Sequence, residues 1–158
     1  MANFYDQEEG LFYYTDVEGE KLIARKKELF DNVIPSSNSM MAKSLYFTGR
    51  YTGVPAYTEL ARQLFAKLKP LTLQDPQWLS NWTDLGLILS QRQVEVVVTG
   101  PDYREWIGVL WQRDVSPATL YFGAADKSTL PVFENRFTGK NTIYTCEDYV
   151  CSMPVYSL

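Results

Sequence analysis

Hydrophobic residues recur with helical spacing through the middle of the sequence. The clearest helix is predicted over residues 55–69, where apolar side chains repeat every three or four residues and share one face. A helix over residues 38–50 precedes it with a broader apolar surface. Because the connection between the two is short, we expect them to pack as an antiparallel hairpin.

A third helix is predicted over residues 76–91, with Asp75 as its N-cap. Pro70 is expected to end the helix before it, because proline disrupts a helix interior. Trp78 and Trp82 are four positions apart, a spacing that favours packing in a shared core over a cofactor site.

Strand patterns follow the helices. Residues 94–99 are rich in β-branched side chains and predict a buried strand, and residues 119–123 predict a second one. A fourth helix around residues 103–111 separates them, so we expect a parallel strand–helix–strand unit. Residues 142–155 are typical of an extended or hairpin-like tail.

The N-terminal part is rich in aromatic residues. Residues 11–15 have strong β propensity and residues 21–24 predict a short return strand, which indicates a ribbon or a long ordered loop. Its aromatic side chains either line a cleft or cover a hydrophobic edge. We therefore expect one mainly α domain with a minor β part: the ribbon or loop over 1–35, helical hairpins over 36–91, and the strand–helix–strand unit with its tail over 92–158.

The composition excludes several classes of protein. With 46% hydrophobic and 22% charged residues, the chain of 158 residues is predicted to be globular rather than disordered. Its net charge of −4 lacks the basic footprint of a nucleic-acid-binding protein. No stretch has the length and apolarity of a membrane-spanning helix, and no signal-peptide pattern is present, so we expect a cytoplasmic protein without membrane contact.

The sequence contains no histidine. A Ser-His-Asp or Cys-His catalytic device and a His-based metal site therefore cannot be built within this chain. Acid–base chemistry would fall to Asp, Glu, Lys or Tyr. Since the two cysteines alone do not make a four-thiolate zinc site, no metal and no cofactor are predicted.

A polar segment before the first predicted helix is the candidate ligand site. In an extended chain Arg25 and Lys27 point to the same side, and Asp31 follows them. Ser37 and Asn38 lie where a helix N-cap is expected. Two cations beside a carboxylate and a helix N-terminus would suit an anionic or hydroxyl-rich ligand. The alternative is a solvated run of charges before a capped helix.

The two cysteines lie near the C-terminus. In one straight strand Cys146 and Cys151 would point to opposite faces, so they meet only if residues 147–150 turn. A disulfide, a thiol pair completed by other groups and two unrelated buried cysteines all remain open. For a cytoplasmic chain we expect reduced, structural thiols.

Five stretches carry a resemblance to a known family. They are FYDQEEGLFYYT at 4–15, LIARKK at 22–27, Asp31 with PSSNS at 35–39, VVVTG at 96–100 and YTCEDYVCSMPV at 144–155. Together they resemble the C-terminal part of the spermatogenesis-associated, thioredoxin-domain-containing proteins. The sequence departs from the family at Gly10-Leu11, where a double glycine is usual, and at Ser37, where glycine is usual.

The resemblance implies an origin in a longer protein. Members of the family have an N-terminal thioredoxin-like domain and an α/α toroid similar to N-acylglucosamine 2-epimerase and six-hairpin glycosidases. This chain would be the last portion of the toroid. Its partner would then be the remainder of that polypeptide or a second copy of itself.

Two functions follow from the resemblance and the polar segment. The first is a structural or interaction domain of such a protein, without a complete catalytic site. The second is part of a carbohydrate-processing cleft, with Asp31 as acid–base, Arg25 and Lys27 holding the ligand, and Tyr13 or Tyr14 stacking against it. Whether the chain is an enzyme is therefore open. Thiol chemistry at the two cysteines is a third hypothesis.

Overall fold

The computed structural model describes residues 1–20, 23–113, 118–124, 130–148 and 150–158. These residues form two compact units. The N-terminal unit comprises Met1–Arg50 and Val54–Ser90, and the C-terminal unit comprises Tyr51–Gly53 and Gln91–Leu158.

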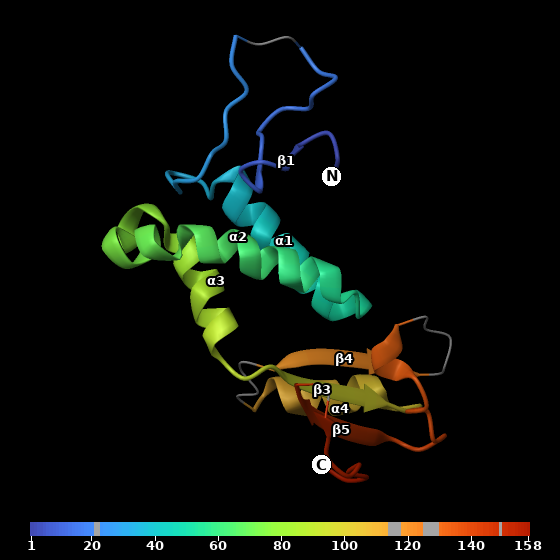
Figure 1. Cartoon of the computed structure of the whole chain (residues 1–158). Coiled ribbons are helices and arrows are strands. Elements are labelled where there is room, and N and C mark those ends of the chain that lie inside the picture. The colour runs from blue at the N-terminus through green and yellow to red at the C-terminus, as the bar shows by residue number, and fades with distance from the viewer. Residues whose placement is uncertain (21–22, 114–117, 125–129, 149) are drawn as a thin grey trace. The chain divides into compact units, whose positions relative to one another are not determined.

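The N-terminal unit combines a short ribbon with three α-helices (Figure 1). In the ribbon, β1 (Tyr5–Asp6) pairs antiparallel with β2 (Leu11–Phe12). The helices are α1 (Ser37–Thr52), α2 (Pro55–Gln74) and α3 (Ser80–Ser90), with a 3-10 turn η1 (Pro76–Trp78) before α3.

One hydrophobic cluster joins the ribbon to all three helices. Its buried members come from β2, α1, α2, α3 and the residue before α3: Leu11, Phe12, Ala42, Leu45, Tyr46, Ala61, Leu64, Leu68, Leu79, Trp82 and Leu85. The helical periodicity of the sequence therefore identified the buried face of α2. The broader apolar surface expected for α1 is buried only in part, since Met40 is 49% exposed.

Two details of the predicted helices are wrong. Pro70 does not end α2, which continues to Gln74 because its last turns still bury Leu68 and Thr72. The third helix does not begin at residue 76, since η1 precedes it and the Asp75 side chain makes no cap hydrogen bond. As a result Trp82 is fully buried whereas Trp78 is 53% exposed, so only one tryptophan of the pair is in the core.

The C-terminal unit is built on a four-stranded sheet with the strand order β4-β3-β5-β6. The unit contains β3 (Val94–Thr99), α4 (Tyr103–Trp111), β4 (Thr119–Gly123), a 3-10 turn η2 (Pro131–Phe133), β5 (Thr142–Glu147) and β6 (Val150–Cys151) (Figure 1). β3 pairs parallel with β4, which confirms the predicted strand–helix–strand unit, and antiparallel with β5.

Alternate residues of β3 are buried on opposite faces of this sheet. Val96 and Val98 pack with Ile107 and Leu110 of α4. Val97 points the other way and packs with Tyr121 and Phe133. Both faces of the central strand are thus covered, which explains its continuous run of valines.

The predicted fold class is wrong. We expected a mainly α partial toroid with an extended tail, but 42% of the described residues are helical, 16% are in strands, and two sheets are present. The hairpin-like reading of residues 142–155 is confirmed, because β5 pairs antiparallel with β6, but β5 also pairs along the whole of β3 and so belongs to the main sheet. Of the predicted return strand over 21–24, residues 21 and 22 lie outside the described residues and 23 and 24 are not in a strand.

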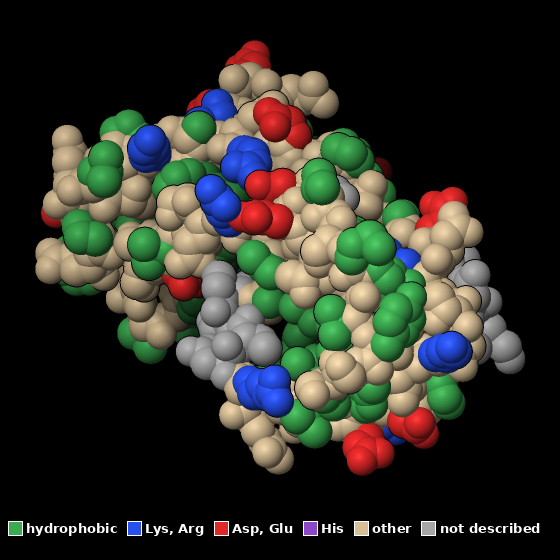
Figure 2. Space-filling view, turned by 90° about the horizontal axis from the view of Figure 1, so that it is seen from below, with side chains coloured by type: hydrophobic (Ala, Val, Ile, Leu, Met, Phe, Trp, Pro, Cys, Tyr) green, Lys and Arg blue, Asp and Glu red, His purple; other side chains and the backbone are tan. Residues whose placement is uncertain are grey.

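Charges and apolar groups are mixed at the surface. On the face in Figure 2, basic and acidic side chains lie beside one another instead of being grouped by sign. In the part of the chain that the structure describes, no helix combines the length and apolarity needed to cross a membrane.

Candidate functional site

Asp31 is the centre of the polar network in the N-terminal unit. Its side chain is buried, with 4% of the residue exposed. Oδ1 accepts hydrogen bonds from the backbone amide of Ser36 at 2.8 Å and from the hydroxyl of Ser39 at 2.7 Å, and Oδ2 accepts one from the amide of Asn81 at 2.8 Å. These donors lie at the beginnings of α1 and α3, where amides lack partners within the helix. The carboxylate therefore serves both helix N-termini.

The backbone around Asp31 reinforces the same joint. Its amide donates to the carbonyl of Trp78, the last residue of η1, at 2.8 Å. The carbonyl of Leu29 accepts hydrogen bonds from the Trp82 indole at 2.8 Å and from the Ser36 hydroxyl at 3.1 Å. The loop before α1 is thus tied to the start of α3 by backbone and side-chain groups together.

Asn38 is fully buried, and its side chain forms hydrogen bonds with the backbone of the ribbon. Its side-chain amide exchanges two hydrogen bonds with the backbone of Phe12, each of 2.7 Å, and donates a third to the carbonyl of Glu28 at 3.0 Å. Asn38 thereby satisfies polar backbone groups that would otherwise be buried without partners. The neighbouring Ser37 hydroxyl oxygen is buried and has no hydrogen-bond partner among the described residues.

Arg25 and Lys27 both contact the ring of Tyr13. The Arg25 guanidinium carbon lies 4.0 Å from the ring centroid and the Lys27 ammonium 4.5 Å from it. Arg25 also donates to the backbone carbonyls of Asn3 at 2.9 Å and Thr15 at 2.7 Å. Because cations already contact the Tyr13 ring, it is poorly suited to stack against a sugar.

Lys27 is held by two carboxylates of the ribbon. Its ammonium donates to Asp6 Oδ2 and lies 2.7 Å from Glu9 Oε2. The hydrogen bonds from Lys27 and from the Tyr13 hydroxyl lower the pKa of the Asp6 carboxyl well below its usual value. Burial lowers the pKa of the Lys27 ammonium, but the hydrogen bonds to Asp6 and Glu9 outweigh burial and raise this pKa above its usual value.

Tyr14 differs from Tyr13 because it is 61% exposed. It borders a pocket of about 460 Å³ formed by residues of the loop before α1: Lys27, Glu28, Leu29, Phe30, Asn32, Val33, Ile34, Pro35 and Ser36. Among these lining residues, all of them described by the structure, Glu28 carries the only carboxyl group. Glycosidases typically need two carboxyl groups, one on each side of the reacting bond, and the lining of this pocket supplies one of them.

A second pocket of about 550 Å³ lies between α2 and α3. Its lining combines apolar residues such as Phe65 and Leu87 with Arg62 and Lys69, and it contains no acidic side chain. The described residues hold no group of three or more His, Cys, Asp or Glu side chains placed to bind a metal ion.

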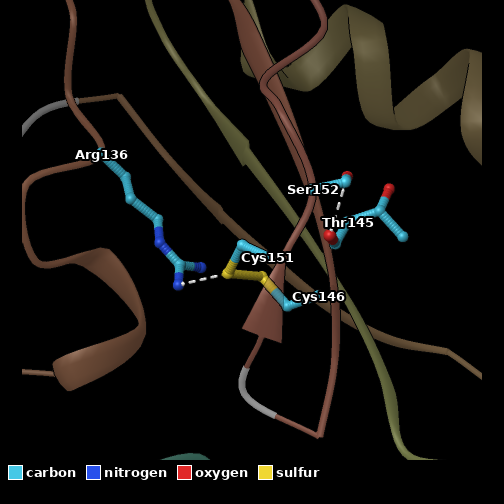
Figure 3. The surroundings of a disulfide bond; sticks show 5 residues. All are labelled: Arg136, Thr145, Cys146, Cys151 and Ser152. Carbon is cyan, nitrogen blue, oxygen red and sulfur yellow. Dashed lines mark hydrogen bonds between the residues drawn. A yellow bond between two sulfur atoms is a disulfide. The ribbon is translucent and has the colours of Figure 1, made fainter.

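Cys146 and Cys151 form a disulfide in the C-terminal unit (Figure 3). They lie opposite each other on β5 and β6, and Asp148 adopts a positive φ of 46° in the turn between them. The expectation of reduced thiols is therefore wrong, because the antiparallel pairing of β5 with β6 brings the two cysteines together. Of the turn expected over 147–150, residue 149 lies outside the described residues. The Arg136 guanidinium donates to the Cys151 sulfur at 3.0 Å.

The structure separates the candidate residues into two groups. Arg25, Lys27 and Tyr13 contact one another at the ribbon. Asp31 and Asn38 instead form hydrogen bonds with buried backbone groups around α1. The sequence did not reveal Asp6 as the partner of Lys27, because an aspartate in a turn is common and its side chain usually binds the turn's own backbone. Asp6 does accept hydrogen bonds from the amides of Glu8 and Glu9. No local signal marks the long-range partners Asn81 and Arg136 either.

Comparison with protein-family models finds no match to this sequence, and comparison with curated proteins finds none either. The resemblance to thioredoxin-domain-containing proteins therefore stays a prediction.

Proposed function

We propose that the chain is a structural and interaction segment of a cytoplasmic thioredoxin-domain-containing protein, without a complete catalytic site of its own. The observation that supports this best is the use of Asp31, whose two carboxylate oxygens accept three hydrogen bonds from donors at two helix N-termini. A buried carboxylate whose two oxygens are both engaged in this way is placed to bind helix donors and is not exposed to a substrate.

The interaction part of the proposal rests on the loop before α1. Ile23, Phe30, Val33 and Ile34 are all exposed, with Val33 at 95% and Ile34 at 74%. Phe30, Val33 and Ile34 line one pocket, and exposed apolar side chains that lie together are typical of a surface that another segment covers. We propose that the remainder of a longer polypeptide covers this loop, as the family resemblance implies.

The test of the interaction surface is a double substitution, Val33→Lys with Ile34→Lys. We expect the isolated wild-type chain to bind a hydrophobic dye and to self-associate in light scattering, and the double variant to do both less. Met153, which is 85% exposed in the other unit, provides the control Met153→Lys. A wild-type chain that stays monomeric and binds no dye would contradict the proposal, as would an equal effect of the control.

A carbohydrate cleft is the second candidate, and exposed Tyr14 beside the 460 Å³ pocket is the observation that favours it. Aromatic faces can stack against sugar rings, and Lys27 and Glu28 lie at the same pocket. Titration with monosaccharides and sugar phosphates, followed by NMR of the backbone amides, separates the two candidates.

We expect no saturable shifts in this titration, and we expect Arg25→Ala and Asp31→Ala each to lower the melting temperature. The cleft would instead be supported by saturable binding that Tyr14→Ala or Arg25→Ala abolishes without lowering the melting temperature. That result would overturn the non-catalytic proposal.

A further inference from the structure

The disulfide joins two sulfur atoms in unlike surroundings. Cys146 is fully buried in β5 and is paired in register with Glu95 of β3 on one side and with Cys151 on the other. Directly opposed residues of antiparallel strands share a face, so the buried acidic residue Glu95 lies beside Cys146. Cys151, in the edge strand β6, is exposed.

Arg136 approaches the exposed sulfur from a different segment. Its Nη2 atom donates to Cys151 Sγ at 3.0 Å, and Figure 3 shows the guanidinium directed at this sulfur. Its Nη1 atom is buried and has no hydrogen-bond partner among the described residues. A disulfide sulfur is a weak acceptor, so this arrangement leaves a cation with unused donor capacity beside it.

The backbone and side chain of Arg136 are held in place. Its carbonyl accepts hydrogen bonds from the Thr99 hydroxyl at 2.8 Å and from the Tyr144 hydroxyl at 3.4 Å. Its guanidinium carbon lies 5.5 Å from the centroid of the Tyr144 ring. The cation is therefore positioned before the sulfur changes state.

These surroundings favour a thiolate at one cysteine only. A guanidinium within hydrogen-bond distance stabilises the thiolate of Cys151 relative to its thiol. Burial beside an acidic residue disfavours a thiolate at Cys146. An exposed sulfur with a stabilised thiolate, next to a buried partner thiol, directs thiol–disulfide exchange to the exposed sulfur.

We propose that Cys146 and Cys151 are a redox-active pair that exchanges with low-molecular-weight thiols. Cys151 is the reacting sulfur, and Arg136 is the residue that positions and stabilises its thiolate. This proposal concerns the C-terminal unit alone and does not depend on the proposed function, whose observations all lie in the N-terminal unit.

The exchange proceeds in two steps. A small thiolate attacks the exposed Cys151 sulfur, a new S–S bond forms to it, and the Cys146–Cys151 bond breaks; Cys146 leaves with the electron pair and takes a proton from solvent. A second small thiolate then attacks the outer sulfur of the mixed disulfide and releases Cys151 as a thiolate beside Arg136. Two small thiols are oxidised to their disulfide while the protein disulfide gains two electrons.

The first experiment measures the thiolate of the reduced chain by ultraviolet absorbance across a pH titration. We expect Arg136→Met to lower the thiolate fraction near neutral pH by roughly tenfold, since a nearby opposite charge shifts a pKa by about one unit or more. Arg136→Lys should restore most of it. Arg92, which precedes β3 and pairs at 2.8 Å with Glu147 of β5, supplies the control Arg92→Met, which should leave the thiolate fraction unchanged.

The second experiment uses glutathione as the probe. In redox equilibrium with reduced and oxidised glutathione, Arg136→Met should shift the folded chain toward the disulfide by roughly tenfold, because the reduced state loses its stabilised thiolate. Cys146→Ser should trap glutathione on Cys151, whereas Cys151→Ser should leave the buried Cys146 unmodified.

Circular dichroism establishes that each variant is folded. The proposal is overturned if the reduced wild type titrates like a free cysteine and Arg136→Met leaves this unchanged. It is also overturned if glutathione reacts with the native chain only at Cys146 or not at all. Because the trapping experiment leaves Arg136 intact, it decides the matter even if Arg136→Met fails to fold.

Discussion

The Oδ2 atom of Asp31 accepts a hydrogen bond of 2.8 Å from the backbone amide of Asn81, 50 residues further along the chain. Its Oδ1 atom accepts one from the amide of Ser36, directly before α1. The positive ends of two helix dipoles thus share a single carboxylate. The joint between α1 and α3 depends on a residue that belongs to neither helix.

Replacing Asp31 should destabilise the N-terminal unit strongly. Asp31→Ala removes the acceptor for three buried or half-buried donors, and we expect a loss of about 2–4 kcal/mol in the free energy of unfolding. Asp31→Asn should lose less, because its amide keeps one oxygen. Denaturant unfolding measures both, and the exposed ion-pair partner Asp84 gives the control Asp84→Asn, with an expected change below about 1 kcal/mol. An Asp31→Ala chain as stable as this control would contradict the structure.

Asn38 should control the protection of the ribbon. Asn38→Ala leaves the amide and the carbonyl of Phe12 without their side-chain partner in a buried site. We expect a loss of about 2–3 kcal/mol and faster hydrogen exchange at the Phe12 amide than at amides within α2. Uniform acceleration throughout the chain would mean instead that the ribbon does not open separately. Unchanged exchange at Phe12 would refute the pairing.

The contact between Asp6 and Lys27 should make stability depend on pH in two directions. Because the pKa of Asp6 is lowered by folding, its contribution is present above the ordinary value of 3.8 and is lost as the pH falls toward the folded-state pKa. Because the pKa of Lys27 is raised, its contribution is present below 10.5 and is lost as the pH rises toward the folded-state pKa.

Melting temperatures recorded across pH test this relationship. Asp6→Asn should flatten the decline of stability in acid, and Lys27→Met should flatten the decline in strong base. Glu18 is exposed, so Glu18→Gln serves as the control and should keep both declines. If the melting temperature of Asp6→Asn falls in acid as steeply as that of the wild type, then protonation of Asp6 is not the cause of the loss of stability.

Two glycines in helices should respond to alanine with opposite signs. A Cβ atom at Gly49 would lie 2.8 Å from the backbone nitrogen of Thr58, so Gly49→Ala forces α1 and α2 apart and should destabilise by about 1–3 kcal/mol. A Cβ at Gly108 of α4 meets no atom within 4 Å, and Gly108→Ala should stabilise by about 1 kcal/mol through helix propensity. Thermal unfolding of both variants measures the difference, and equal signs would contradict the close packing at Gly49.

The local pattern predicts elements well where neighbouring residues decide the structure. The strand over 94–99 and the helix over 55–69 were both identified, since a run of β-branched residues and a helical repeat of apolar ones are visible in a short window. The parallel pairing of β3 with β4 was also predicted, because a helical crossover between strands permits little else.

Local sequence patterns predict the wrong structure where contacts with a segment far away in the sequence determine it. Pro70 lies inside α2 because packing of the last turns outweighs the hydrogen bond that proline removes. The sequence of residues 142–147 does not show that they belong to the main sheet. They form β5 there because β3 supplies backbone hydrogen-bond partners along their whole length. That pairing joins the C-terminal stretch to the predicted parallel pair of strands, in an α/β fold instead of the expected mainly α one.

The candidate site shows the same division. Residue types and spacing placed Arg25, Lys27, Asp31 and Asn38 in one polar segment, which is as far as a sequence can go. Tertiary structure assigned their partners, namely a tyrosine ring, a ribbon carboxylate and buried backbone groups. A hydrogen bond depends on which donor is brought within about 3 Å, and only the folded chain decides that. The unlike surroundings of Cys146 and Cys151 arise for the same physical reason, because burial and the Arg136 contact exist only once the sheet has formed.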